Sequence, residues 1–288
     1  MGFYFTAILL GLGFASLAIG IFISMRIFNI PDITTDGSFT LGGAVTAILL
    51  TRDVSLPVIF IAAFFSGAVA GAITGFIHTR LRVNALLAGI LTMTALYSVN
   101  LALMGRSNIP LTDTQTLFTI GSFFSNEVSQ QAFVLVVFAF FLWQLIGWIL
   151  KTDFGIAMRA TGSNETMIRA MSVNTNWMKI IGLGMANGLT ALSGFLIAQV
   201  QGFADINMGI GIVILGLGSV MIGEIFSNLF QFRSIKTQLL FVIGGSILFR
   251  LLLAFALSIG IDAVYLKLVV AVFVLIAVSI PNLKRVHD

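Results

Sequence analysis

The chain has 288 residues, of which 58% are hydrophobic and only 9% are charged, and its formal net charge is +4. Soluble domains carry about 25% charged residues, so this composition excludes a soluble globular protein. A helix needs about 20 apolar residues to cross a bilayer, so the length allows roughly eight to ten crossings and leaves no room for a separate catalytic domain. The fifteen basic residues are scattered among apolar runs and form no basic face, which argues against nucleic-acid binding.

Nine apolar segments follow one another along the chain, and each is predicted to be a helix of a membrane bundle. The predicted fold class is all-α, a polytopic bundle of about 8–10 spans in a single transmembrane domain over residues 1–288. The second and seventh segments are short and follow polar stretches, so we expect broken or re-entrant helices there. The nine segments are residues 3–25, 39–50, 56–77, 83–104, 132–150, 180–200, 210–225, 239–259 and 263–280.

The polar stretches before the two short segments, residues 32–38 and 205–211, are similar in sequence. If they are approached from opposite sides of the membrane, they form an inverted repeat whose two interrupted helices meet near the bilayer midplane. The alternative is chance similarity between common residue types. If the repeat is real, Asp36, Ser38 and Asn207 are candidates for lining a polar path.

Three glycines recur every four residues along the third segment, at Gly67, Gly71 and Gly75. This spacing places them on one helix face, where small residues let a neighbouring helix approach closely. The pattern predicts a compact bundle.

A long polar loop, residues 151–179, separates the fifth and sixth segments. Within it Ser163 or Asn164 can cap a short helix, Glu165 lies in the first turn, and Arg169 follows Glu165 by four residues. We therefore predict a helix of two to three turns.

On that helix Met167, Ile168 and Met171 are expected to share one face and to form an apolar ridge. One interpretation is an interfacial helix that lies on lipid headgroups. The other is a helix that docks into a groove on a cytoplasmic partner, with methionines giving an adaptable contact surface.

Arg250 lies about midway along the eighth segment, where an unpaired charge costs at least ~2.5 kcal/mol on insertion scales. A structural role, as a clamp on backbone carbonyls or a partner in a dimer interface, and attraction of a substrate carboxylate both remain open. No carboxylate lies securely in mid-membrane. This favours an ATP-driven system over an ion-driven one.

The distribution of basic residues predicts the orientation. With the amino terminus outside, eleven of the fifteen basic residues fall on the cytoplasmic side, so we expect the carboxyl terminus to be cytoplasmic. The eleven are Arg26, Arg80, Arg82, Lys151, Arg159, Arg169, Lys179, Arg233, Lys236, Lys284 and Arg285.

Motifs for chemistry are absent from the sequence. It contains no phosphate-binding P-loop, so the chain is not expected to bind ATP in the usual way. It has no cysteine and only two histidines, and we predict no metal site, no cofactor and no catalytic residue.

Five motifs together resemble the membrane-spanning permease subunits of bacterial ABC importers. The nearest group is that of the less-characterised relatives of the branched-chain amino acid and ribose permeases. The motifs are IxDxTxDGSFxLG at 30–42, FGxAMRATGxN at 154–164, GLxMANGL with LSG at 182–194, GFADxxMGxG at 202–211 and IGE at 222–224.

The resemblance implies a non-enzymatic permease of the bacterial plasma (inner) membrane that forms a homodimer. Its implied partners are two cytoplasmic ABC ATPase subunits, an extracytoplasmic substrate-binding protein and the lipid bilayer. ATP hydrolysis in the ATPases would drive alternating access for a small solute of the amino-acid class, with aromatic and branched-chain amino acids as the candidates. The alternatives are a self-sufficient ion-coupled secondary transporter and, more weakly, a channel or scaffold.

The candidate residues fall into two groups. Those for ATPase coupling are Gly162, Ser163, Asn164, Glu165, Met167, Ile168, Arg169 and Met171. Those for the translocation path are Asp36, Ser38, Asn187, Asp205, Asn207 and Arg250.

Overall fold

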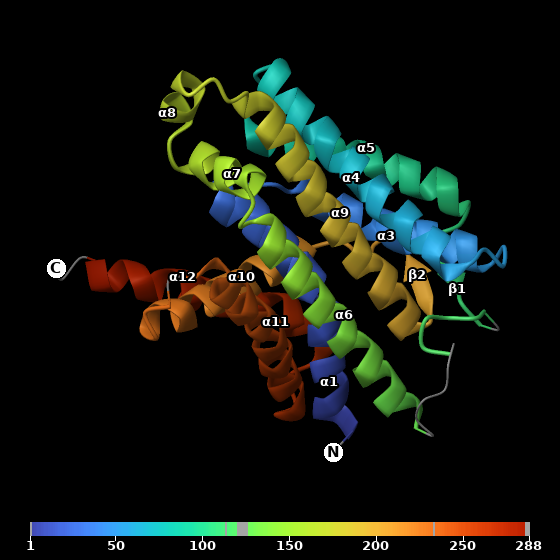
Figure 1. Ribbon diagram of the computed structural model, residues 1–288. Helices are drawn as coiled ribbons and strands as arrows, with labels where there is room; N and C mark the ends of the chain where they lie inside the picture. The colour runs from blue at the N-terminus through green and yellow to red at the C-terminus, as the bar shows by residue number, and fades with distance from the viewer. Residues whose placement is uncertain (1, 113, 120–125, 233, 286–288) are drawn as a thin grey trace.

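A computed structural model describes residues 2–285 apart from 113, 120–125 and 233. Arg233, one of the cations predicted to be cytoplasmic, lies outside these residues. The described chain is a helical bundle with one short pair of strands (Figure 1). Its elements are α1 (Gly2–Gly13), α2 (Ala15–Ile21), the π-helical turn η1 (Phe22–Ile27), α3 (Thr34–Leu50), α4 (Leu56–Arg80), α5 (Ala85–Met104), β1 (Asn108–Pro110), α6 (Glu127–Ile149), α7 (Asp153–Ser163), α8 (Glu165–Ala170), α9 (Thr175–Gln201), β2 (Phe203–Asp205), α10 (Ile212–Leu229), α11 (Ile235–Ser258), η2 (Ala263–Tyr265) and α12 (Leu266–Arg285).

Helices occupy all nine predicted apolar segments, which confirms the all-α membrane bundle. Among the described residues six helices are long and apolar enough to cross a membrane: α4, α5, α6, α9, α10 and α11. The first segment adds a seventh if its two halves, which are bent by 41° between α1 and α2, form one span. Broken or re-entrant helices are predicted at 39–50 and 210–225, where the structure has α3 with 17 residues and α10 with 18 residues. Among the described residues the 41° break lies instead between α1 and α2.

Helix α9 is the centre of the bundle, and most of its residues are buried. It packs against α2, α3 and α4. The glycine face of α4 makes this contact: a Cβ at Gly67 would overlap Asn187, and one at Gly71 would overlap the carbonyl oxygen of Leu183. The predicted close approach at Gly67, Gly71 and Gly75 is therefore confirmed, because the backbone of α9 fills the space of the missing side chains.

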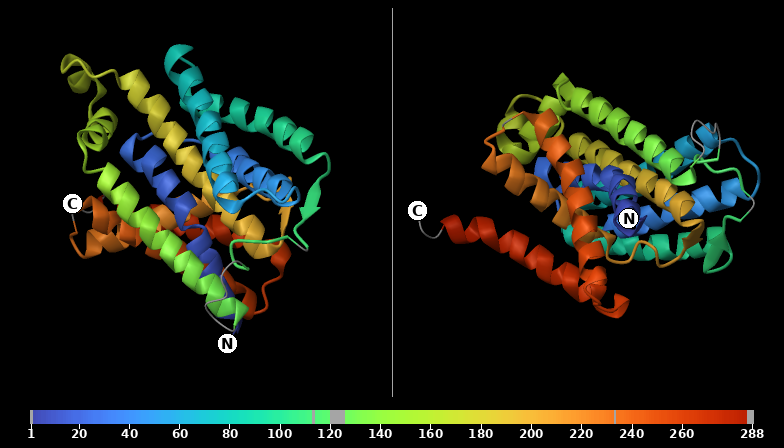
Figure 2. Two further views of the ribbon diagram at one scale, coloured as in Figure 1. Left: turned by 45° about the vertical axis from the view of Figure 1, so that its right-hand side comes forward. Right: turned by 90° about the horizontal axis from the view of Figure 1, so that it is seen from below.

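The two ends of the bundle differ. Strands β1 and β2 pair antiparallel, with Ile109 opposite Ala204, beside the carboxyl end of α9. Helices α7 and α8 precede α9 and lie at its other end (Figures 1 and 2). Since α9 joins the two ends, they lie a membrane span apart.

The outer helices expose large apolar side chains. Phe65 and Val69 on α4, and Phe140 and Trp148 on α6, are all more than half exposed. Lipid tails satisfy such faces in a membrane protein, so this pattern agrees with a bundle embedded in a bilayer.

Candidate functional site

The loop between α6 and α9 folds into the two short helices α7 and α8. Asn164 caps α8, since its Oδ1 accepts hydrogen bonds from the Met167 N–H at 3.0 Å and the Thr166 hydroxyl at 2.9 Å. Asn164 is thus the cap, and Ser163 instead ends α7, where its hydroxyl donates to the carbonyl oxygen of Arg159. Helix α8 has only six residues, so the predicted two to three turns are too long; the chain turns away at Ser172, where φ is +64°.

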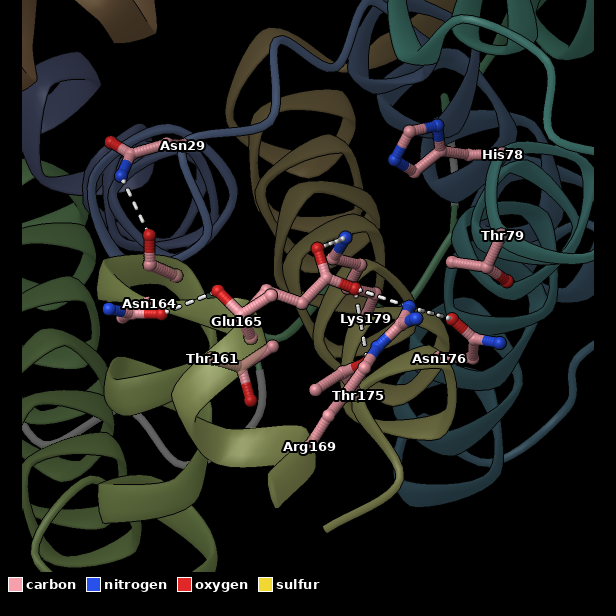
Figure 3. Close-up of polar contacts among 12 residues, drawn as sticks. Asn29, His78, Thr79, Thr161, Asn164, Glu165, Arg169, Thr175, Asn176 and Lys179 are labelled. Carbon is pink, nitrogen blue, oxygen red and sulfur yellow. Dashed lines mark hydrogen bonds and ion pairs between the residues drawn. The ribbon is translucent and has the colours of Figure 1, made fainter. Parts of the chain in front are cut away.

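Glu165 ties α8 to the start of α9 (Figure 3). Its carboxylate lies 2.7 Å from the Arg169 guanidinium and 2.6 Å from Lys179 Nζ, and the Thr175 hydroxyl donates to it at 3.0 Å. Arg169 Nη2 also donates to Asn176 Oδ1 at 3.3 Å. The predicted Glu165–Arg169 pair is present, and it belongs to a larger ionic cluster that holds α8 in place.

This cluster perturbs the acidity of Glu165. Partial burial by itself raises the pKa of the carboxyl, but the hydrogen bond and charge of Lys179, with the hydrogen bonds of Thr175 and Arg169, outweigh it and lower the pKa below its ordinary value. Glu165 is therefore ionised at neutral pH and engaged within its own chain.

The large exposed apolar side chains here are Met167 on α8, which is 54% exposed, and Met171, the residue that follows α8, which is 66% exposed. They are four residues apart and share a face. Ile168 is only 6% exposed, so the prediction of a three-residue ridge is wrong for it: it lies about 100° around the helix from Met167 and packs inward. The apolar surface offered to a partner is a pair of methionines.

A polar cavity of about 590 Å³ lies beside this ionic cluster. It is formed by the end of α4, the α4–α5 turn and the start of α9. Glu165 is the one carboxylate among the described residues that line it, against several basic groups. The lining residues are His78, Thr79, Arg80, Arg82, Val83, Asn84, Glu165, Arg169, Asn176 and Lys179.

Gly162 connects the loop to the membrane helices. The Asn29 side-chain amide donates to the carbonyl oxygen of Gly162 at 3.2 Å, and a Cβ at Gly162 would overlap the carbonyl oxygen of Ile27. The end of α7 therefore packs directly on the chain that leads from η1 into α3. A displacement of α7 would therefore act directly on the segment that leads into α3.

A buried polar cluster joins that same chain to α9. The Asn187 amide donates to Asp32 Oδ2 at 2.6 Å, and Asn187 Oδ1 accepts from the Ser38 hydroxyl at 2.7 Å. Asp32 Oδ1 in turn accepts from the Thr34 N–H at 2.9 Å. All four residues are buried. Asp32 was not among the residues predicted from the sequence, although it lies in the polar stretch 32–38 that precedes the second apolar segment.

Asp36 joins the two polar stretches that resemble one another in sequence. Its carboxylate accepts hydrogen bonds from the N–H groups of Gly211 and Val213, both at 2.9 Å. These groups begin α10, so Asp36, in the first turn of α3, supplies the side-chain cap of α10. The two helix starts do meet, and Asp36 has a structural role there.

The other three path candidates, Arg250, Asp205 and Asn207, line one cavity of about 280 Å³. Arg250 Cζ lies 4.0 Å from the centre of the Phe14 ring, and its buried Nε has no hydrogen-bond partner. No described carboxylate forms an ion pair with it. Asp205 Oδ1 accepts from the Asn207 N–H at 2.8 Å. The candidates thus separate into three places: this cavity, the buried cluster that contains Ser38 and Asn187, and Asp36 at the start of α10.

Comparison with known proteins gives a family match over almost the whole chain. Residues 3–279 match the family described as the permease component of branched-chain amino acid transport systems. A tyrosine transport system permease protein of Clostridioides difficile is 38% identical over 267 residues, which cover 93% of this chain and 87% of that protein.

Two further relatives span a range of similarity. An uncharacterized protein of Rickettsia prowazekii is 36% identical over 281 residues, 97% of this chain and 98% of that protein. A ribose import permease protein of Escherichia coli is 24% identical over 257 residues, 88% of this chain and 78% of that protein. No solved structure matches the chain significantly.

Proposed function

We propose that this chain, which belongs to the family of permease components of branched-chain amino acid transport systems, forms one half of the membrane path of an ATP-driven importer. It is a transport subunit and not itself an enzyme. In this proposal two copies form the path, two cytoplasmic ATPase subunits supply the energy, and an extracytoplasmic binding protein delivers the solute.

The observation that carries the proposal is the construction of the α7–α8 loop. Its ionic cluster around Glu165 fixes α8, while Met167 and Met171 present a free apolar face suited to a groove on the ATPase. The adjoining cavity, with Arg80 and Arg82, is suited to acidic groups at the edge of such a groove. The alternative, an interfacial helix that lies on lipid headgroups, would not need the ionic cluster around Glu165 to fix its position.

The route from this loop to the path supports coupling. Movement of α7 would act on Ile27 and Asn29 through Gly162. From there the chain runs through Asp32, which is hydrogen-bonded to Asn187 on α9. ATP-driven motion of the loop would thereby shift α3 against α9 and change access to the path.

The orientation follows if α8 is cytoplasmic. The amino terminus lies at the opposite end of the bundle from α8, so it would be outside (Figure 1). The strand pair β1–β2 would then face the binding protein. The carboxyl terminus is proposed to be cytoplasmic, in the plasma membrane of a bacterium.

The proposed substrate is an amino acid. The relative named for tyrosine transport and the family described for branched-chain amino acids both support this class. Both kinds of substrate join an α-amino carboxylate to an apolar or aromatic side chain.

Copurification tests the coupling surface. The chain is co-expressed with its ATPase as wild type, as Met167→Asp with Met171→Asp, and as Met167→Leu, which keeps an apolar side chain of similar size. We expect the double aspartate variant to retain membrane insertion and lose at least tenfold of the recovered ATPase, because a charge replaces each apolar contact. The leucine variant should copurify normally. Full recovery with the double aspartate variant would refute docking through α8.

A further inference from the structure

Arg250 is a membrane-embedded cation for which the described part of the chain offers no counter-ion. It lies in the apolar helix α11, about two turns before the helix ends. Its buried Nε has no hydrogen-bond partner, and no described carboxylate lies within ion-pair distance. A charge at such a place costs about 2.5–3.5 kcal/mol on insertion scales.

The guanidinium is held by an aromatic platform. Arg250 Cζ is 4.0 Å from the centre of the Phe14 ring, a distance typical of a cation–π contact. Phe14 lies at the 41° bend between α1 and α2, and its ring stacks on Phe39 of α3 with 5.7 Å between centroids. The bend and the stack orient Arg250, while a stacked guanidinium keeps its N–H edge free for a planar anion.

Arg250 lines a cavity that has room for a small solute. Its volume is about 280 Å³, close to the lower limit of about 300 Å³ for small-molecule sites. Its walls combine apolar and polar groups, with Asp205 the one described carboxylate among them. The lining residues are Phe14, Phe39, Ile197, Gln201, Phe203, Asp205, Asn207, Met208, Ile212 and Arg250.

The cavity lies where a solute would enter the proposed translocation path. Gln201 ends α9, and Phe203 and Asp205 belong to β2. Strand β2 lies at the end of the bundle opposite α7 and α8 (Figure 1). In the proposed orientation this end faces the binding protein. A solute released there would meet this cavity before the buried cluster around Asn187.

We propose that this cavity is a binding subsite for the carboxylate of an amino acid, with Arg250 as its ligand. A carboxylate accepts two parallel N–H bonds from a guanidinium, and Arg250 would offer these from its two Nη groups. The oxygens of Asp205 and Asn207 would accept from the ammonium group, and Phe14, Phe39 and Ile197 would contact the side chain. This inference rests on the proposed function for the orientation and for the amino-acid class.

The cysteine-free sequence makes a direct test possible. A single Gln201→Cys reporter on the cavity wall is placed in the Arg250, Arg250→Lys and Arg250→Gln backgrounds of the purified permease. Its rates of reaction with an anionic and a cationic methanethiosulfonate are compared. We expect the anionic-to-cationic rate ratio to fall about fivefold or more in the glutamine background and to stay high with lysine. An equal ratio in all three backgrounds would overturn the proposal, because Arg250 would then not face the cavity.

Protection by ligand tests the chemical class. L-leucine, L-phenylalanine and L-tyrosine are each compared with the corresponding amide, which lacks the carboxylate. We expect at least one amino acid, and none of the amides, to slow modification at least threefold, and this protection to disappear with Arg250→Gln. Equal protection by an amide, protection that survives in Arg250→Gln, or no protection by any amino acid would each overturn the subsite.

A parallel uptake assay separates this inference from the proposed function. If the wild-type complex shows ATP-dependent uptake but ligand protection is the same with Arg250 and with Arg250→Gln, the subsite is rejected and the importer function stands. Carboxylate-dependent protection of the permease without ATP-dependent uptake by the complex would reject the importer function and leave the subsite intact.

Discussion

Replacing Asp36 with alanine should destabilise the protein by removing the cap of a helix more than 170 residues away in sequence. The Asp36 carboxylate accepts two N–H bonds at 2.9 Å from the start of α10. Loss of a side-chain N-cap costs about 0.5–2 kcal/mol. Loss of a negative charge at a helix amino terminus adds about 0.3–1 kcal/mol. The expected total is therefore about 1–3 kcal/mol.

Thermal unfolding of the detergent-purified permease measures this change. One kcal/mol corresponds to about 2–4 °C for chains of 150–250 residues, so a loss near the middle of the range should lower Tm by roughly 4–8 °C. Asp36→Asn keeps one acceptor but loses the charge, and about half the effect is expected. Asp153→Ala, which removes an exposed carboxylate from the first turn of α7, is the matched control and should change Tm little. An unchanged Tm for Asp36→Ala with reduced uptake would refute the capping role and return Asp36 to the translocation path.

Gly245→Ala should lower the free energy of unfolding by about 1–3 kcal/mol, because its Cβ would overlap the Ser219 carbonyl oxygen. Gly244→Ala, whose Cβ meets nothing within 4 Å, is the control and should be neutral or slightly stabilising. Equal effects of the two substitutions would contradict the packing of α10 on α11. Because the folded pKa of Glu165 is below its ordinary value of 4.5, the ionic cluster stabilises the loop fully above about pH 4.5 and loses that contribution as the pH falls through the folded pKa. ATPase binding measured from pH 7 downward should therefore stay level to about pH 4.5 and weaken below it. Glu165→Gln should weaken binding at pH 7 and remove this acid-dependent step. An acid transition unchanged by the substitution would assign it to another group.

The sequence was sufficient for the bundle because each helix carries its own signal, an apolar run long enough for a membrane. The same was true of the glycine face of α4, which depends on a fixed spacing. The cap of α8 depends on neighbours within a turn, and the sequence narrowed it to Ser163 or Asn164. Residue types alone also identified Arg250 as a cation in need of a partner.

What the sequence did not reveal depends on distant partners. The contact of Asp36 with α10 was not predicted because its bonding partners, at the start of α10, lie far along the chain. Asp32 was not predicted as a site residue because its partner Asn187 lies 155 positions away in the sequence. The bend at Phe14 lies inside an otherwise continuous apolar run, so hydropathy alone predicts a straight helix there.

The central claim, that the chain is the path of an ATP-driven importer and depends on partners for energy, is tested most directly by reconstitution. The permease is placed in vesicles with and without its ATPase and binding protein, and uptake of radiolabelled L-leucine, L-phenylalanine and L-tyrosine is followed. The account predicts concentrative uptake of at least one of them only when both partners and ATP are present, and none on a proton or sodium gradient. Uptake by the permease alone, driven by such a gradient, would contradict it.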